Sequence, residues 1–357
     1  MFSNSVERGD EMKRNRKHLP FALLVALVVL GMVTAAAAKD YLYIPGTNIL
    51  HIIDCETDTV VKTVPYNDYM VNATPSQDGK RYYMNNWRSV TVLDTQTDKI
   101  IDRHEFWSEL NRVYVNPGIA VSVDGNYLYL SLVIAKKKLN VPRLNVMPPQ
   151  FAVYDLKKRE IVRSFDIPPC CNAVLTLRDD PDHAILMAQD IFKINVKNGK
   201  MTKIKGVLHP EEGEPPLNSL VIWNNWSPGD HGIFVNGTYS MADGSLFYMM
   251  IDKKGNLSML KGEDAVMVYS SVISPDKKYI YSAMDEVYKV DLQTGKTLAK
   301  DVLARGTCYA VALTADGKKL YVGPAGPDVT VYDTATMKPL GVIALKSDGV
   351  ITHRISK

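Results

Sequence analysis

Short segments in which apolar and polar residues alternate recur along this chain, separated by turn-forming residues. The clearest stretch, residues 268–345, contains the same pattern twice: VYSSVISPDKKYIYSAMDEVYKVDLQTGKTLAKDVL and CYAVALTADGKKLYVGPAGPDVTVYDTATMKPLGVIAL. Each copy predicts four strands joined by tight turns. Four strands in about forty residues are typical of one blade of a β-propeller. The pattern therefore predicts an all-β fold that consists of a ring of such units.

An aspartate at the end of the predicted third strand marks each unit. It occurs six times, and an asparagine replaces it in a seventh, weaker copy: Asp54, Asp94, Asp155, Asn195, Asp252, Asp291 and Asp333. An aspartate that opens a tight turn accepts backbone N–H bonds from residues shortly after it, and glycine or asparagine then takes the positive-φ position. We therefore expect seven blades, with these side chains as turn formers rather than catalytic groups.

The two ends of the repeat region predict how the ring closes. Segment 41–45 matches the second strand of a unit, so the first unit lacks its first strand. The tail GVITHRISK is short and alternating, and it can supply that strand. Closure by strands from both termini removes the exposed edge that an open sheet would leave. The prediction is one seven-bladed β-propeller over residues 39–357.

Two insertions interrupt the repeat. Segment 134–150, between the second and third strands of the third unit, holds three lysines and three prolines and suits an extended arm on the surface. Segment 209–217, HPEEGEPPL, is acidic and proline-rich and precedes the first strand of the fifth unit. Such a sequence suits a rigid bracket against a partner. Solvated loops are the alternative for both insertions.

The formal charge of +3 is concentrated at the N-terminus. Residues 1–38 hold five Lys or Arg against three Asp or Glu, which is +2 and leaves +1 for the remainder. A nearly neutral body lacks the basic face that nucleic acid requires. No nucleic-acid partner is therefore expected.

Residues 1–38 are predicted to form a signal peptide. A positive region, residues 13–17, precedes an apolar run, residues 21–33, and a small-residue cleavage site at Ala36 and Ala38. We expect cleavage before Lys39 and a periplasmic protein without membrane contact after cleavage; Met12 is an alternative start. The alternative is an uncleaved anchor helix, for which the apolar run is short.

Common catalytic sequence motifs are absent from this chain. It contains no Gly-x-Ser-x-Gly, His-Glu-x-x-His or phosphate-binding loop, and no Cys-x-x-Cys-His for c-type haem. No two of its seven histidines lie two or four residues apart. We predict no catalytic, cofactor-binding or metal-binding residue in this chain, although residues of several blades could still meet at a channel mouth.

Six residues are candidates for contact with a partner or for lining a cavity. They are Trp107, Cys171, Trp223, Trp226, Cys308 and Tyr309. The two cysteines occupy equivalent positions before the first strands of two units, where we expect them near one mouth of the central channel. The tryptophans lie in or beside connections, and tryptophan is enriched at protein interfaces. Core packing is the interpretation we favour for the tryptophans, and a partner interface is the alternative.

The adjacent Cys170 and Cys171 allow two interpretations. An exported chain can oxidise its cysteines, so a strained ring disulfide between the two is one alternative. Two free, buried thiols are the interpretation we favour, because free cysteine behaves as a small buried hydrophobic residue.

Several segments together resemble the β subunit of bacterial quinohemoprotein amine dehydrogenase. The resemblance rests on the signal peptide, the neutral seven-unit ring, the insertion LNVMPPQFAVYD, the stretch VIWNNWSPGDHGIF and the paired units over residues 269–345. It covers about residues 39–345. The aspartate turns alone are shared by many periplasmic YVTN-type propellers, and the heavy chain of methylamine dehydrogenase is a more distant likeness.

The resemblance implies a heterotrimer that oxidises a primary amine to an aldehyde and ammonia. A di-haem cytochrome c subunit would carry electrons away, and a small subunit would hold cysteine tryptophylquinone and the catalytic base. The propeller would hold the small subunit and form one wall of the substrate cavity, without a cofactor of its own. No family signature matches Cys170, Cys171 or Cys308, so the identity of the amine stays open. The alternative is a stand-alone periplasmic propeller that binds a protein or a polymer.

Overall fold

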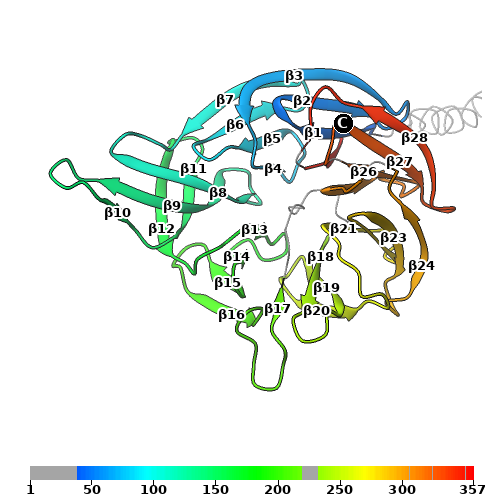
Figure 1. The fold of residues 1–357 in the computed structure, drawn as a ribbon. Coiled ribbons are helices and arrows are strands. Elements are labelled where there is room, and N and C mark those ends of the chain that lie inside the picture. Colours follow the sequence, from blue (N-terminus) through cyan, green and yellow to red (C-terminus); the bar gives the residue numbers. More distant parts are fainter. Residues whose placement is uncertain (1–37, 219–231, 305, 324, 350) are drawn as a thin grey trace, which may run out of the picture. The chain divides into compact units, whose positions relative to one another are not determined.

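Seven β-sheets form the described part of the protein. The computed structural model describes residues 38–218, 232–304, 306–323, 325–349 and 351–357. Residues 39–357 form one compact unit, whose described residues form twenty-nine strands and no helix. The sheets are arranged as the blades of a propeller (Figure 1). The predicted all-β, seven-bladed fold is confirmed.

Residues 1–37, which hold nearly all of the predicted signal peptide, lie outside the described residues. Among the residues that are described, no helix is long and apolar enough to cross a membrane.

The first three blades are formed mainly by the N-terminal half of the chain. Blade 1 consists of β29 (His353–Ser356), β1 (Asp40–Pro45), β2 (Thr47–Asp54) and β3 (Thr59–Tyr69). Blade 2 consists of β4 (Asn72–Pro75), β5 (Arg81–Asn85), β6 (Ser89–Asp94) and β7 (Lys99–Glu105). Blade 3 consists of β8 (Asn111–Val121), β9 (Tyr127–Lys137), β10 (Leu144–Val146), β11 (Gln150–Asp155) and β12 (Glu160–Asp166).

The other four blades follow in chain order. Blade 4 consists of β13 (Ala173–Thr176), β14 (His183–Met187), β15 (Ile191–Asn195) and β16 (Met201–Lys205). Blade 5 consists of β17 (Leu217–Asn218), β18 (Ile233–Ser240), β19 (Leu246–Asp252) and β20 (Leu257–Lys261). Blade 6 consists of β21 (Ser270–Ile273), β22 (Tyr279–Ala283), β23 (Glu286–Asp291) and β24 (Thr297–Val302). Blade 7 consists of β25 (Ala310–Leu313), β26 (Lys319–Gly323), β27 (Asp328–Asp333) and β28 (Lys338–Ala344).

Strands from both termini close the ring, as predicted. β29 pairs antiparallel with β1, with Ile355 opposite Tyr41 and His353 opposite Tyr43. Ile355 is buried in the cluster between blades 1 and 2, so the tail contributes apolar packing as well as strand pairing. The tail thus supplies the inner strand that blade 1 lacks.

The hydrophobic core consists of seven clusters, each between two successive blades. β5 shows how one strand serves two of them. Tyr82 packs towards blade 1, and the next residue, Tyr83, packs towards blade 3. Because successive side chains of a strand point to opposite faces, a blade between two neighbours buries both sets. Positions that would be polar in a sheet with one solvent-exposed face are therefore often apolar in these strands.

The seven predicted turn formers each end the third strand of a blade, and each accepts backbone N–H bonds two or three residues on. Their role as turn formers is confirmed. The expectation of glycine or asparagine at positive φ holds in only three turns. Those three are glycines, Gly199, Gly255 and Gly295, while Asp58, Asp98, Arg159 and Met337 take this position elsewhere.

Contacts between blades explain two of these exceptions. The carboxylate of Asp58 accepts the hydroxyl of Tyr321 from blade 7 at 2.6 Å. The carboxylate of Asp98 accepts the hydroxyl of Tyr43 from blade 1 at 2.5 Å. A glycine would avoid the cost of positive φ, on the order of 1 kcal/mol, but would lose these contacts between blades.

Segment 134–150 forms a projecting arm, as predicted, and the name arm is used for these residues from here on. β9 continues past Leu132, where its pairing with the first residue of β11 ends. The chain then turns back as β10, which pairs with the extended part of β9 (Figure 1). The short strand β10 was not predicted. The arm lies between the second and third main strands of blade 3.

Candidate functional site on the loop face

The connections of the propeller alternate between two faces, because each blade is antiparallel. The turn face carries the turns from the first to the second strand and from the third to the fourth strand of each blade. The loop face carries the connections from the second to the third strand and the links from each blade to the next. The arm and segment 209–217 both belong to the loop face.

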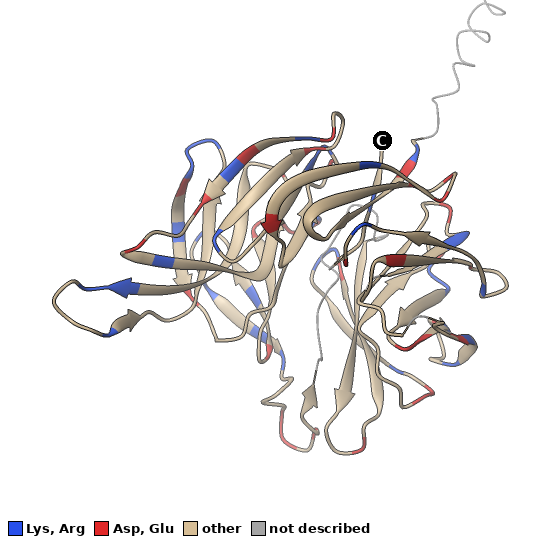
Figure 2. Cartoon of the chain, turned by 45° about the horizontal axis from the view of Figure 1, so that its top comes forward, with Lys and Arg blue, Asp and Glu red and all other residues tan. Residues whose placement is uncertain are grey.

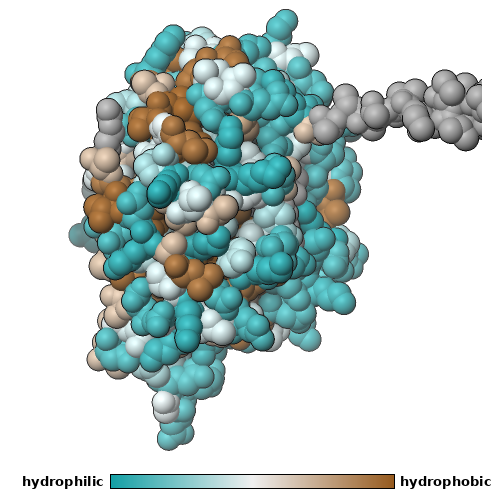
Figure 3. Space-filling view, turned by 90° about the vertical axis from the view of Figure 1, so that its right-hand side faces the viewer, coloured by the Kyte–Doolittle hydropathy of each residue, from teal (hydrophilic) through white to brown (hydrophobic). Residues whose placement is uncertain are grey.

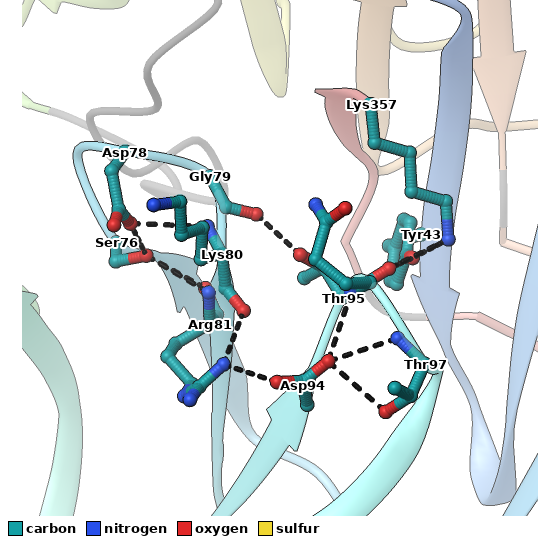
Figure 4. A network of polar contacts seen from close by, with 11 residues as sticks. Tyr43, Ser76, Asp78, Gly79, Lys80, Arg81, Asp94, Thr95, Thr97 and Lys357 are labelled. Carbon is teal, nitrogen blue, oxygen red and sulfur yellow. Dashed lines mark hydrogen bonds and ion pairs between the residues drawn. The ribbon is translucent and has the colours of Figure 1, made fainter.

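On the turn face, polar side chains bond to residues nearby in the sequence, as blade 2 illustrates (Figure 4). The Ser76 hydroxyl donates to Asp78 at 2.6 Å, and Arg81 forms an ion pair with Asp94. The backbone N–H of Thr97, at 2.9 Å, is the main cause of the lowered pKa of Asp94. These groups bond to one another within the blade.

A hollow on the turn face is lined by the same kind of polar turn residues. It has a volume of about 370 Å³ and lies between blades 2 and 3, where Ser76, Asp78 and Asp124 line it. The hydroxyl of Ser122 donates to Asp124 at 2.6 Å, as Ser76 does to Asp78. These three lining side chains therefore serve the repeated turns, while the Oε1 of Gln77, which also lines the hollow, is buried without a hydrogen-bond partner among the described residues.

The predicted site residues that are described all lie on the loop face. Trp107 lies between β7 and β8, Cys171 between β12 and β13, and Cys308 and Tyr309 between β24 and β25. They belong to three different links between blades. Trp223 and Trp226 lie outside the described residues. Whether these residues contact a partner or a substrate stays a prediction.

Trp107 packs against a residue of the neighbouring connection. The guanidinium carbon of Arg88 lies 4.6 Å from the centre of the indole ring, in the geometry of a cation–π contact. The indole Nε1 is buried and has no hydrogen-bond acceptor in the described part of the chain. Next to Arg88, the side chain of Trp87 is 45% exposed. Two tryptophans and an arginine thus gather on the loop face between blades 2 and 3.

The cysteines correct one sequence-based expectation. All four are free, and Cys171 is buried, but Cys170 is exposed, so the adjacent pair is not two buried thiols. Cys170 takes a positive φ of 61°, and its side chain lies outside the core. Burial raises the pKa of the Cys171 thiol to about 12 and also raises the pKa of Cys308. Both buried thiols are therefore protonated near neutral pH and are poor nucleophiles.

A small pocket lies beside Cys308 at the loop face of blade 7. Its volume is about 250 Å³, and Thr307, Cys308, Gly326 and Asp328 are among the residues that line it. The adjacent Tyr309 packs edge-to-face on Tyr269, with ring centres 5.7 Å apart. This region combines aromatic rings, a thiol and a carboxylate.

Asp190 is a loop-face residue that the sequence analysis did not identify. Its carboxylate accepts the backbone N–H groups of Val207 at 2.8 Å, Leu208 at 3.1 Å and His209 at 3.0 Å. Burial would raise its pKa, but these donors outweigh that effect and lower it. The donors lie 17 to 19 residues after Asp190, so no local motif indicates the contact.

Segment 209–217 borders an apolar pocket of about 260 Å³. Pro215, Leu217, Phe247 and Met259 line it, together with the ion pair of Lys205 and Glu214. Asp190 anchors the start of this segment, and Leu217 ends it in β17. The segment therefore packs on blade 5 and leaves an apolar recess at the edge of the loop face.

The outer rim offers a less continuous surface. Leu298 and Val302 on β24, and Leu340 and Val342 on β28, are exposed. Viewed from this side, hydrophilic side chains break up the apolar areas (Figure 3). Isolated exposed apolar residues are ordinary on protein surfaces, so the rim does not form a comparable candidate site.

In the described residues, no group of three His, Cys, Asp or Glu side chains could hold a metal ion.

Comparisons with known proteins show the fold. No family model matches the chain, and no curated protein matches it. A functionally unknown protein from Desulfotomaculum acetoxidans is similar, with a TM-score of 0.58 and 12% identity over 88% of this chain and 99% of that one. Dihydro-heme d1 dehydrogenase NirN, solved in complex with DHE, has a TM-score of 0.55 and 14% identity over 89% of this chain and 75% of that one.

A third similar structure is apo AztD from Citrobacter koseri, with a TM-score of 0.55 and 12% identity over 90% of this chain and 99% of that one. At such identities the similarity shows the fold alone. The protein is a seven-bladed β-propeller, and its resemblance to the amine dehydrogenase subunit stays a prediction.

Proposed function

We propose that this chain is the non-catalytic propeller subunit of a periplasmic quinohemoprotein amine dehydrogenase. In the proposed complex, a primary amine and water give an aldehyde and ammonia, and two electrons and two protons are released. The quinone and the haems belong to the partner subunits. This chain would hold the small quinone-bearing subunit and form part of the wall around the amine.

The distribution of irregular segments carries this proposal. The arm, segment 209–217, Trp107 and Cys308 all lie on the loop face, whereas the turn face repeats one polar turn around the ring. The arm is also one of the segments on which the sequence resemblance rests. A face that collects exposed aromatic rings and an apolar recess suits a protein partner.

Purification from the native host tests the proposal. Lys39 and Lys357 lie together on the turn face, where the Lys39 N–H donates to the Lys357 carbonyl at 2.9 Å. An affinity tag after Lys357 therefore leaves the loop face free. We expect a di-haem subunit, detected by its absorbance, and a small quinone-bearing chain to co-purify.

Matched variants on the two faces sharpen this test. Trp107→Ala should reduce the co-purified haem by about tenfold, which corresponds to about 1.4 kcal/mol. Lys158→Ala, in an exposed turn of the turn face, should leave the haem unchanged. Thermal melts establish that both variants fold. A lone monomer would overturn the proposal, and a haem-free complex with another protein or a polymer would favour the stand-alone propeller.

A further inference from the structure

The register of the arm fixes a mixed cationic and apolar surface. Ala135 lies opposite Arg112 on one side and Val146 on the other, and Lys137 lies opposite Leu144. Residues opposite each other, and residues two apart on one strand, share a face of the sheet. Arg112, Lys137, Leu144 and Val146 therefore lie on the same face of the arm.

Leu144 and Val146 on this face lie outside the core. Val113 and Ile134, on the opposite face of the same strands, pack against the cluster between blades 2 and 3. Leu144 and Val146 could join that cluster only if the register slipped by one residue. They remain 38% and 67% exposed, and Leu139 at the tip of the arm is 87% exposed.

The positive charge of the arm has no counter-charge nearby in the sequence. No acidic residue occurs between Asp124 and Asp155. Four cations lie in this interval, and none has an ion-pair partner among the described residues: Lys136, Lys137, Lys138 and Arg143. Blue segments mark basic residues along the projecting arm (Figure 2). Uncompensated charge of one sign attracts a partner of the opposite sign.

The arm also has an open strand edge. β10 is the outermost strand on its side of the sheet, and no other described strand pairs with its free edge. Lysines beside an open edge can serve merely to prevent aggregation. That role does not account for Leu144 and Val146, whose exposed apolar side chains would favour aggregation. Together they indicate an edge that is covered in a complex.

We propose that the arm binds an acidic, extended segment of a partner protein. The segment would add as a strand along β10, with apolar side chains covering Leu144 and Val146 on one face of the arm and carboxylates facing Lys136 and Arg143 on the other. Strand addition of this kind draws its affinity from backbone hydrogen bonds and its specificity from alternate side chains. The arm contains no Trp, Tyr or Phe, which membrane-surface segments use as anchors, so a protein fits better than a lipid surface.

A labelled peptide tests this inference without any haem or quinone subunit, so the result is independent of the proposed enzyme complex. The probe is fluorescein-labelled Glu-Val-Glu-Val-Glu-Val-Glu, and fluorescence anisotropy measures its binding to the chain from Lys39 to Lys357. We expect saturable binding that weakens as salt rises, because salt screens exposed charges. Replacing the central valine by proline, which removes a backbone donor, should weaken binding about tenfold.

Charge-reversed variants complete the test. K136E/R143E should lose at least about tenfold in affinity, whereas K157E/K158E, the same change in a turn on the turn face, should bind as the parent protein does. Thermal melts check the folding of both variants. Equal binding of the valine and proline peptides, equal loss in both variants, or no binding would overturn the proposal. Binding to phosphatidylglycerol vesicles but not to the peptide would assign the arm to a membrane instead.

Discussion

The turn face and the loop face belong to the same seven blades but use polar groups differently. On the turn face, an aspartate or asparagine binds the N–H groups of its own turn, as Asn195 does for Lys197 at 3.0 Å and Asn198 at 3.1 Å. On the loop face, the Trp107 indole N–H is buried without an acceptor in the described chain, and side chains such as Trp87 are exposed. The repeated turns thus lie on one face, whereas the connections and insertions of the other face differ from blade to blade, as recognition requires.

The largest expected effect on stability comes from removing β29, the strand that closes the ring and so supports both faces. Deletion of residues 350–357 removes β29, together with the buried side chains of Ile351, His353 and Ile355. We expect the loss of about 5 kcal/mol or more, which is comparable to the whole stability of many domains. Urea unfolding measures the change.

A milder substitution keeps this prediction testable if the shortened chain fails to fold. Ile355→Ala should lower the free energy of unfolding by about 2–5 kcal/mol, the usual range for such a truncation in a core. An unchanged melting temperature in the deletion variant would contradict ring closure by the tail.

A buried histidine makes this closure sensitive to acid. His353 is buried, and its Nδ1 lies 2.9 Å from the Tyr82 hydroxyl. Burial lowers its pKa to about 3, from about 6.5 in the unfolded chain. Between these values the unfolded chain binds the proton and the folded chain does not, so stability falls as pH decreases through this window. The loss at pH 4.5 should be about 2–3 kcal/mol.

The slope of stability against pH tests this prediction better than a single value. Burial also lowers the pKa of His51 and His104, which act in the same direction. His353→Gln should therefore flatten the dependence between pH 6.5 and pH 4.5 without abolishing it. Urea unfolding across this range measures the slope, and identical slopes in both proteins would contradict the assignment.

The smallest effects compare one carboxylate on each face. Asp190→Ala should cost about 2 kcal/mol, because the N–H groups of Val207 and His209 lose their acceptor, while that of Leu208 keeps the Gln189 carbonyl. Asp252→Ala, which removes an acceptor from the exposed Lys254 and Asn256 N–H groups, should cost about 1 kcal/mol. Hydrogen exchange should accelerate at Val207 only in the first variant. Equal exchange in both variants would remove the distinction between the faces.

The predictable parts of the fold were those with local sequence signals. The turn aspartates bind N–H groups two or three residues away, so their spacing alone indicated seven blades. The tail was predictable because it alternates and because blade 1 lacked a strand. Unequal burial of the two adjacent cysteines was not predictable, because it depends on the positive φ of Cys170.

The candidate site was less predictable because its contacts join distant segments. Arg88 and Trp107 meet across two connections, and the donors to Asp190 come from the following link between blades. β10 has no strand signal of its own, since it follows a proline and becomes a strand only by pairing with the extended β9. In each case the determining interaction involves a partner that a short sequence window does not contain.

The pairing of β29 with β1 also means that the ring has no structural starting point. Lys39 and Lys357 exchange two backbone hydrogen bonds of 2.9 Å, so a short linker could join them. New termini could then be opened in an exposed connection of another blade, and every inter-blade cluster would keep both of its sides. Blade 1 combines strands from both ends of the sequence only because the termini lie within it. In a circularly permuted protein, the blade that holds the new termini would be the composite one.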